Sequence, residues 1–374
     1  MKGTTTHNSI EPNAATALPL ERDVADFAGQ LAGAMIGAAS LATASLGDRL
    51  GLYAAMAGKP PVTSGELADA TGFDERLLRE WLAQQATAGF LRYEAPTQSF
   101  SLPPAHAAVL VDGVSPASMI GDITMAATLF LDTEAVAGAF GSGHGLDWAL
   151  HDPLVFEATE RFWGARYRAG LEGWLALLPE LDAALRTGAT VADVGCGRGY
   201  PAVLLAGMYP GARITGFDAH EPSIQLARER ANAAGLAARV DFTLSDAAGY
   251  PGTGYDLITF FDAFHDLGDP LGAAIHARDA LADGGTLLLI EPYSAGSLAQ
   301  NLAQNPAAAF GYAASIFLCT PNSLSQPVGL ALGAMSGEQT LRGILAQAGF
   351  TAVEKVAETP FNLVLAAQRR HSDH

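Results

Sequence analysis

The sequence predicts an α/β protein, with a doubly wound parallel sheet in the C-terminal half and a mostly helical N-terminal part. Two observations lead to this prediction. Short apolar strands alternate with helical stretches beyond residue 190, and a glycine-rich turn directly follows the first of these strands. At 374 residues the chain is also long enough for two domains, each with its own core.

The first strand and its turn read V-A-D-V-G-C-G-R-G over residues 191–199. Asp193 lies in the strand, and Gly195, Gly197 and Gly199 follow at alternating positions. Glycine permits a sharp turn and lets a ligand approach the backbone closely, because no Cβ is present. An apolar helix over 201–208 then offers its N-terminal N–H groups to such a ligand.

Four further strands follow in order. The second ends in Asp218, 23 positions after Gly195, where an acid can accept both hydroxyls of a ribose. The third ends at Asp246 and Ala247, the fourth begins at Tyr255, and the fifth, T-L-L-L-I-E-P, begins at Thr286. Helical stretches over 221–234 and 270–281 separate them, as expected for a parallel sheet with crossover helices.

These residues resemble the class I S-adenosylmethionine-dependent methyltransferases. The signals D-V-G-C-G-R-G, Asp218, S-D-A, Y-D-L-I and G-G-T-L-L-L-I-E-P occur in that family's order and spacing. The turn is G-x-G-x-G rather than the G-x-G-x-x-G of dinucleotide binders. The segment V-A-E-T-P-F-N-L-V-L-A-A resembles the family's antiparallel last strand. The resemblance therefore implies a Rossmann-like sheet with S-adenosyl-L-methionine as the cofactor.

The resemblance also implies a cofactor site at the carboxyl ends of the strands. Asp218 is expected to hold the ribose, Asp246 is expected to accept from the adenine amino group, and Ala247 is expected to offer a backbone N–H. The other cofactor-binding residues predicted are Asp193, Gly195, Gly197, Gly199, Phe261 and Tyr167. Tyr167, Arg161 and Arg166 are alternative partners for the cofactor carboxylate. The charges of the two arginines are equally compatible with an ordinary helix surface.

His265 is the predicted catalytic residue. A hydroxyl acceptor benefits from a base, and imidazole has a suitable pKa for that role. The W-x-x-H-D-W signature of small-molecule O-methyltransferases aligns with 262–267, which implies His265 as base, Asp266 beside it and Glu291 as the acid that orients it. Leu267 replaces the second Trp, and the second orienting acid expected near Met335 is absent, with Glu338 out of register. Positioning of the substrate is the alternative role for His265.

The block over residues 21–110 is predicted to be a winged-helix domain. Thr63, Ser64 and Glu66 form helix-capping signals, a second helix begins at Asp74, and 89–93 with 99–102 alternate like two short strands. The second helix mixes arginines with acids, whereas a DNA-reading helix needs uncancelled positive charge. The block resembles the dimerisation domain of small-molecule O-methyltransferases, which implies a homodimer.

Composition limits the other possibilities. A net charge of −18 argues against nucleic-acid binding. The two cysteines, Cys196 and Cys319, imply no disulfide framework, and no metal-ligand spacing is evident. Residues 27–47 are uncharged and nearly long enough to span a bilayer, but their small side chains favour a packed helix over a membrane span. Without a signal peptide pattern, the cytoplasm is expected.

The predicted organisation is a disordered tail over 1–20, the winged helix over 21–110, connecting helices over 111–175 and a catalytic domain over 176–370. The connecting helices and the uncharged segment 304–337, with Phe310, Tyr312 and Phe317, are expected to wall a substrate pocket or to pack in the core. The predicted function is methyl transfer to a small organic molecule in specialised metabolism, first of all to oxygen. Transfer to carbon or nitrogen, use of the sulfonium without transfer, and a ligand-sensing regulator that binds DNA remain open.

Overall fold

The computed structural model describes residues 19–111 and 117–369. The chain divides into two compact units, residues 1–103 and 104–374, a few residues before the boundary expected at 110. Most of the predicted disordered tail lies outside the described residues, as do His371 and His374. Each unit is described below by itself.

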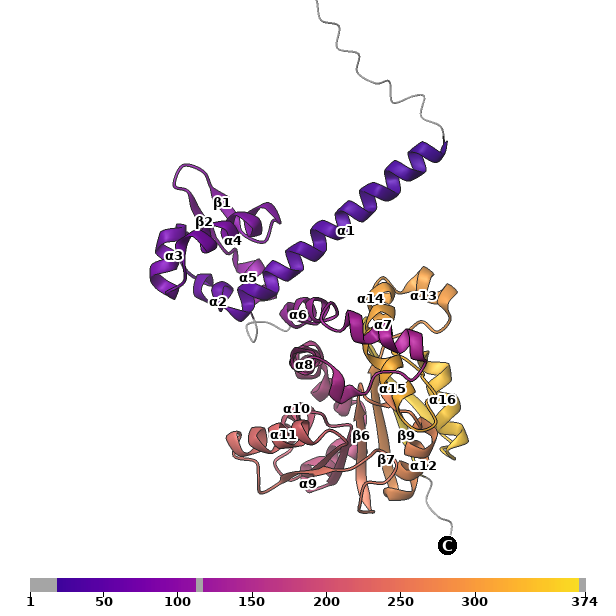
Figure 1. Ribbon diagram of the computed structural model, residues 1–374. Helices are drawn as coiled ribbons and strands as arrows, with labels where there is room; N and C mark the ends of the chain where they lie inside the picture. Colours follow the sequence, from indigo (N-terminus) through magenta and orange to yellow (C-terminus); the bar gives the residue numbers. More distant parts are fainter. Residues whose placement is uncertain (1–18, 112–116, 370–374) are drawn as a thin grey trace, which may run out of the picture. The chain divides into compact units, whose positions relative to one another are not determined.

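The first unit is helical with one small hairpin (Figure 1). Its elements are α1 (Pro19–Arg49), α2 (Leu52–Met56), α3 (Ser64–Thr71), α4 (Glu75–Thr87), β1 (Arg92–Glu94) and β2 (Ser99–Ser101). The expected helix starts are present: Thr63 and Glu66 form a capping box on α3, and Asp74 accepts the Leu77 N–H at the start of α4. β1 and β2 pair antiparallel and supply the wing after the two helices.

Helix α1 leaves an apolar stripe exposed along its N-terminal half. Five side chains at spacings of three and four residues are 60–73% exposed: Leu20, Val24, Phe27, Leu31 and Met35. Such spacing places them on one face of the helix. By length and composition alone, α1 is also long and apolar enough to cross a membrane, so the membrane alternative weighed from the sequence concerns this helix.

The second unit is an α/β sheet domain with many helices. Its helices before the sheet are α5 (Pro104–Leu110), α6 (Ile120–Thr128), α7 (Thr133–Ser142), η1 (Trp148–Leu150), α8 (Pro153–Ala176) and α9 (Pro179–Thr187). The alternating part is β3 (Thr190–Val194), α10 (Tyr200–Met208), β4 (Arg213–Asp218), α11 (Glu221–Ala233), β5 (Val240–Leu244), β6 (Tyr255–Phe261), η2 (Phe264–Asp266), α12 (Pro270–Ala280) and β7 (Leu281–Pro292). The remainder is α13 (Leu298–Gln304), α14 (Ala308–Ala314), η3 (Ser315–Cys319), α15 (Thr320–Ser325), α16 (Gly337–Gln347), β8 (Val353–Glu358) and β9 (Asn362–Gln368).

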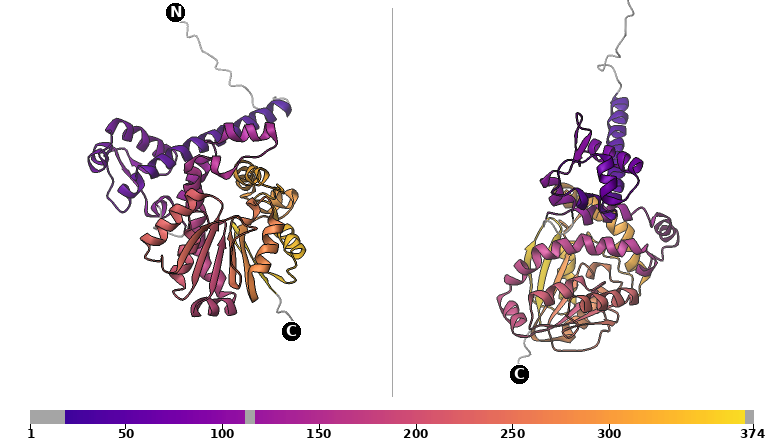
Figure 2. Two further views of the ribbon diagram at one scale, coloured as in Figure 1. Left: turned by 60° about the horizontal axis from the view of Figure 1, so that its bottom comes forward. Right: turned by 90° about the vertical axis from the view of Figure 1, so that its left-hand side faces the viewer.

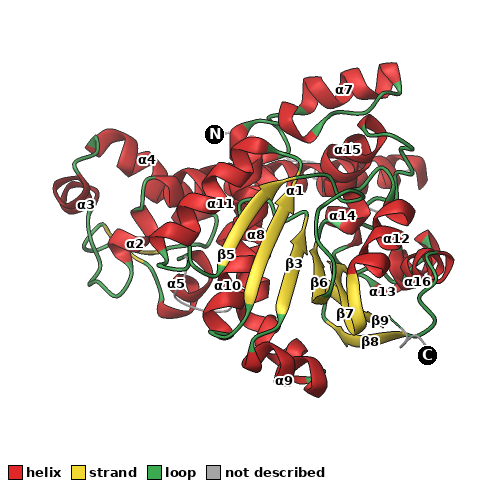
Figure 3. Cartoon of the chain, turned by 90° about the horizontal axis from the view of Figure 1, so that it is seen from below, coloured by secondary structure: helices red, strands yellow, loops and turns green. Residues whose placement is uncertain are grey.

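The seven strands of this unit form one mixed sheet in the order β5-β4-β3-β6-β7-β9-β8 (Figure 3). β3 to β7 run parallel, whereas β9 pairs antiparallel with both β7 and β8. The chain order reverses between β3 and β6, and the carboxyl ends of these two strands bracket the position where open α/β sheets bind ligands. The predicted sheet with an antiparallel last strand is confirmed.

Helices cover both faces of the sheet (Figure 2). Val191 points into one core with α8, α9, α10 and α11, and its neighbour Ala192 points into the other with α12 and α16. This alternation is the two-residue period of a strand buried on both faces. The central strands therefore have apolar side chains on both sides.

Candidate active site

The glycine turn after β3 is tightly packed at two of its three glycines. All three have positive φ, at 71° for Gly195, 51° for Gly197 and 74° for Gly199. A Cβ on Gly195 would lie 2.6 Å from Ala263 Cβ, and one on Gly199 would lie 2.5 Å from the Phe242 ring. A Cβ on Gly197 would meet nothing within 4 Å. Gly197 therefore leaves open space at the turn, into which a ligand fits.

Two carboxyl groups flank this turn, the half-buried Asp218 and the buried Asp193. Asp218, at the end of β4, accepts N–H bonds from Gly197 at 2.8 Å and from His220 at 2.9 Å. Asp193 accepts the Thr259 hydroxyl at one oxygen, and its Oδ2 is buried without a partner among the described residues. Burial raises the pKa of Asp193 to about 7, against the lowering effect of Thr259. The open space at Gly197 and the unpaired Asp193 oxygen fit a bound adenosine bearing a cationic amino-acid chain.

The remaining predicted cofactor residues lie around the same sheet edge. Asp246 is exposed after β5 and accepts the Ala248 N–H, while Ala247 is half-buried next to it. Phe261 ends β6 and is buried, with its ring 5.1 Å from that of Tyr167 in an edge-on arrangement. The Tyr167 hydroxyl donates a hydrogen bond to the Asp262 carboxyl group.

The predicted catalytic trio lies together, with His265 hydrogen-bonded to Glu291 and paired by charge with Asp266. His265 Nδ1 lies 2.6 Å from Glu291 Oε2, and His265 Nε2 lies 3.2 Å from Asp266 Oδ1. The Glu291 carboxylate also accepts the backbone N–H groups of Phe264 and His265. Because Glu291 ends β7 and the η2 turn follows β6, the parallel pairing of these strands brings the two groups together.

The charges around His265 favour its protonated form. Burial by itself would lower the pKa of His265, but Asp266 and Glu291 together raise it well above its ordinary value. Burial raises the pKa of Asp266, whereas the nearby imidazole of His265 lowers it. The two neighbouring carboxyl groups therefore favour the protonated form of His265 in the free protein.

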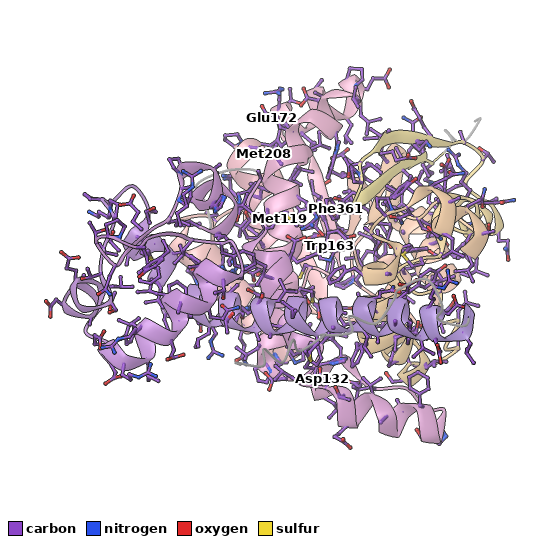
Figure 4. All side chains as sticks on the ribbon, turned by 90° about the horizontal axis from the view of Figure 1, so that it is seen from above. Met119, Asp132, Trp163, Glu172, Met208 and Phe361 are labelled. Carbon is purple, nitrogen blue, oxygen red and sulfur yellow. The ribbon has the colours of Figure 1, made fainter. Side chains whose placement is uncertain are left out.

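A cavity with about 720 Å³ of empty space, part of it open to solvent, lies against this trio. Asp262, His265 and Asp266 form its polar part, and the other lining residues are mostly aromatic or apolar. The lining comprises Met125, Trp148, Thr159, Phe162, Trp163, Pro292, Tyr293, Asn305, Ala307, Phe310, Gly311, Ala314, Leu318, Cys319, Ala334, Met335, Pro360 and Phe361. Figure 4 labels Trp163 of α8 and Phe361 of the turn before β9 among them. The walls thus suit a flat apolar molecule.

The cavity and the glycine turn are adjacent. Ala263, which packs against Gly195, stands between the cavity residues Asp262 and His265 in the chain. A ligand held over the turn therefore lies next to the space that these side chains enclose. This adjacency is the arrangement that a group transfer between two bound molecules requires.

Two site features could not be seen in the sequence. Asp262 adopts a left-handed φ of 49°, which is uncommon for Asp, and its Oδ2 accepts the Tyr167 hydroxyl at 2.5 Å. Cys319 enters the cavity from the π-helical turn η3, a conformation that is often found at functional sites. The pattern F-F-D-A-F-H-D was the only sequence signal for a role of Asp262, and no sequence pattern indicated that Cys319 lies in the site.

One group of possible metal ligands occurs among residues 19–111 and 117–369. The ligand atoms of His265, Asp266 and Cys319 lie within 4.8 Å of one another. The two polar members already form an ion pair, and burial raises the pKa of the Cys319 thiol to about 12, so the group is accounted for without a metal ion. The absence of a metal stays a prediction.

Three further titratable side chains, Glu338, His151 and Arg166, have partners within the protein. Glu338 pairs with Arg342 and Lys355, whereas Met335, at the position of the missing second acid, lines the cavity. His151 is buried against Asp132 at 2.6 Å. Arg166 bonds to Asp122. The structure therefore gives these residues partners other than a bound ligand.

Of the three aromatic residues predicted for segment 304–337, one lines the cavity. Phe310 lies in the cavity wall, whereas the Tyr312 hydroxyl accepts a bond from Asn301. Phe317 packs against the neighbouring apolar cluster and does not line the cavity.

Comparison with protein-family models matches both units. Residues 37–112 match a Rv2258c-like winged HTH domain, and residues 185–349 match a methyltransferase domain. The chain therefore contains a methyltransferase domain, preceded by a winged-helix domain. The expected family is confirmed, and with it the winged helix.

Curated relatives of this methyltransferase align over part of its length. The trans-aconitate 2-methyltransferase of Streptomyces avermitilis is 35% identical over 119 residues, which are 32% of this chain and 43% of that protein. The 27-O-demethylrifamycin SV methyltransferase of Amycolatopsis mediterranei is 32% identical over 107 residues, 28% of this chain and 39% of that protein. The chain thus spans less than half the length of these relatives.

Solved structures match the methyltransferase along nearly its whole length. The mitomycin 7-O-methyltransferase MmcR has a TM-score of 0.63 and 21% identity, covering 93% of this chain and 99% of that one. Human N-acetylserotonin methyltransferase, solved with S-adenosylmethionine, has a TM-score of 0.60 and 18% identity, covering 96% and 100%. At these identities the likeness establishes the fold.

Proposed function

We propose that the protein transfers a methyl group from S-adenosylmethionine to a hydroxyl oxygen of a small aromatic molecule, with His265 as the base. The observation that carries this proposal is the His265–Glu291 pair at 2.6 Å, buried in an aromatic-walled cavity beside the glycine turn. S-adenosylmethionine supplies an electrophilic methyl carbon on a positively charged sulfur. The solved O-methyltransferases with this fold support the choice of oxygen.

The residues divide the work between two ligands. Asp218, Asp193 and the turn around Gly197 hold the cofactor, as their position at the sheet edge supports. Phe162, Trp163 and the other aromatic side chains hold the acceptor and exclude water. A dry site strengthens the interactions of the few charges inside it.

His265 handles the proton of the acceptor. Glu291 accepts the Nδ1–H and fixes the ring orientation, so Nε2 is the atom that takes the hydroxyl proton. His265 must first lose the proton that the neighbouring carboxyl groups of Asp266 and Glu291 stabilise. It then takes the hydroxyl proton as the acceptor oxygen attacks the methyl carbon. Asp266 then stabilises the imidazolium that forms.

Labelled cofactor tests this proposal. The protein is incubated with methyl-labelled S-adenosylmethionine and a panel of small phenols, and S-adenosylhomocysteine and methylated product are measured. Release of both, with the label on oxygen by NMR, is the expected result. A product labelled on carbon or nitrogen would change the acceptor class, and no release with any acceptor would refute the proposal.

A DNA-binding regulator is the second candidate function. The arginines of α4 are paired within the helix, Arg76 with Glu80 and Arg79 with Glu75, both at 2.6 Å. This cancellation supports the expectation that α4 does not bind the DNA backbone. A gel-shift assay with random duplex DNA at low salt is expected to show no complex, and a salt-sensitive complex would favour the regulator.

The homodimer is proposed on the apolar stripe of α1. Five exposed apolar side chains on one helix face are a large unpartnered surface, which a second copy of the chain would bury. Replacing Phe27 and Leu31 by Glu is expected to shift the protein from dimer to monomer in analytical ultracentrifugation. Ala25→Glu, on another face of α1, is the control and is expected to leave the dimer intact.

Wild-type protein that sediments as a monomer would refute the dimer. Wild-type protein that requires detergent to remain in solution would favour the membrane alternative for α1. The cytoplasmic location stays a prediction.

A further inference from the structure

Asp262 is a buried carboxyl group with one oxygen held and one oxygen free. Its Oδ2 accepts the Tyr167 hydroxyl at 2.5 Å and the Asn362 amide at 3.4 Å. Its Oδ1 is buried and has no partner among the described residues. An unpaired buried carboxyl oxygen is costly, so its retention needs a reason.

The free oxygen belongs to the cavity. Asp262 lines the cavity with His265, whereas the two donors to Oδ2, Tyr167 and Asn362, are not among the lining residues. Oδ2 is therefore the oxygen held by the protein, and Oδ1, which has no partner among the described residues, is the oxygen left for a molecule bound in the cavity. Asp262 also keeps a left-handed φ of 49°, which persists only where the surroundings enforce it.

The protonation state decides what the free oxygen can bind. Burial, together with the charge of Glu291, raises the pKa of Asp262 well above its ordinary value, although Tyr167, His265 and Arg166 act in the opposite direction. Both neighbours of Oδ2 donate to it, so the proton of the neutral acid resides on Oδ1. Oδ1 is then a hydrogen-bond donor, and its complement is an oxygen that accepts, such as a carbonyl.

We propose that Asp262 is a specificity-determining residue that donates from Oδ1 to a carbonyl oxygen of the acceptor, so that the preferred substrates are aromatic molecules carrying both a hydroxyl and a ring-attached carbonyl. His265 addresses the hydroxyl and Asp262 the carbonyl, from the same loop after β6. This inference rests on the proposed function, since it names the substrate class of the same cavity.

Binding without transfer tests this directly. The probes are 2-naphthol and its 1-acetyl, 3-acetyl and 6-acetyl derivatives, which differ in where the carbonyl stands. Affinities are measured by calorimetry in the presence of S-adenosylhomocysteine, which cannot donate a methyl group. Wild-type protein is expected to bind at least one acetyl derivative about tenfold more tightly than 2-naphthol, the size of one charge-free buried hydrogen bond.

Two variants then assign the preference to Asp262. Asp262→Ala removes the donor and is expected to bring the affinity ratio to about one. Asp262→Asn keeps an acceptor for Tyr167 and places an amide donor at the free position, and Asn tolerates the left-handed φ, so it is expected to retain most of the preference. Should Asp262→Ala fail to fold, Asp262→Glu, which displaces the donor by one methylene, replaces it.

Four results would overturn the inference. They are a ratio of one for all acetyl derivatives in wild-type protein, an unchanged ratio in Asp262→Ala, absence of binding by all four probes, and a loss of S-adenosylhomocysteine binding in Asp262→Ala, which would assign Asp262 to the cofactor. These binding results are distinguishable from failure of the proposed function, which the labelled-cofactor assay reports.

Discussion

The two halves of the site are built in different ways. The edge proposed for the cofactor consists of the glycine turn, Asp193 and Asp218, all within two adjacent parallel strands and their ends. The cavity proposed for the acceptor has walls from α6, η1, α8, η3 and the turn before β9, which are scattered along the chain. Backbone geometry thus determines the first half, whereas side-chain packing between distant segments determines the second.

The largest expected effect tests the point where the two halves meet. His265→Ala is expected to slow turnover by roughly 10²–10⁴ while leaving cofactor affinity unchanged, because the base is lost but the turn is not touched. Stopped assays with saturating cofactor give the rate, and calorimetry gives the affinity. His276→Ala, whose ring bonds to the Tyr250 carbonyl elsewhere in the unit, is the matched control. Near-normal turnover would reduce His265 to a part of the cavity wall.

Removing the acid at the cofactor edge is expected to act on binding. Asp218→Ala loses hydrogen bonds from a charged acceptor, about 2–3 kcal/mol, or roughly 30- to 150-fold in cofactor affinity. Asp241→Ala, on the exposed side of β5, is expected to have no effect. Equal affinities of the two variants in calorimetry would break the assignment of this edge to the cofactor.

The pH profile separates the base from the binding residues. Because the pKa of His265 is raised, its neutral form is scarce at neutral pH and increases with pH. Turnover at low acceptor concentration is therefore expected to rise about tenfold per pH unit below that pKa and to level off above it. In His265→Gln the rise of turnover with pH is expected to disappear. A rise that persists in this variant would reflect ionisation of the acceptor hydroxyl instead.

The smallest expected effect concerns the cavity wall. Phe310 lines the cavity and packs against Phe162 with ring centroids 5.7 Å apart. Phe310→Ala is expected to raise the acceptor KM by about fivefold, close to 1 kcal/mol of aromatic contact, without a change in cofactor affinity. Phe317→Ala removes an aromatic side chain that does not line the cavity, and the same KM change there would show that the effect is general loosening.

The difference between the two halves also explains what the sequence could predict. The alternation of strands and helices, the glycine turn and the position of Asp218 follow from local patterns, since strand ends in a parallel sheet lie at one edge. The contact between His265 and Glu291 was implied by the resemblance and follows from the pairing of β6 with β7. Local pattern was therefore sufficient where neighbouring strands carry the groups.

Contacts between residues far apart in the chain could not be predicted from the sequence. The bond from Tyr167 to Asp262 joins residues 95 positions apart, and helical periodicity on α8 gives a buried face without saying what it meets. The position of Cys319 depends on a π-helical turn that no residue pattern announces. The same reason accounts for Met335 lining the cavity while Glu338 turns to Arg342.

That π-helical turn has a consequence for how such a protein diversifies. A π turn holds one residue more than an α turn, so loss of a single codon within 315–319 would restore an ordinary helix. The helix beyond it would then rotate by roughly 100°, carrying Leu318 and Cys319 away from the pocket and presenting other side chains in their place. One deletion could thus give descendants of this gene a new range of substrates while every strand of the sheet stays the same.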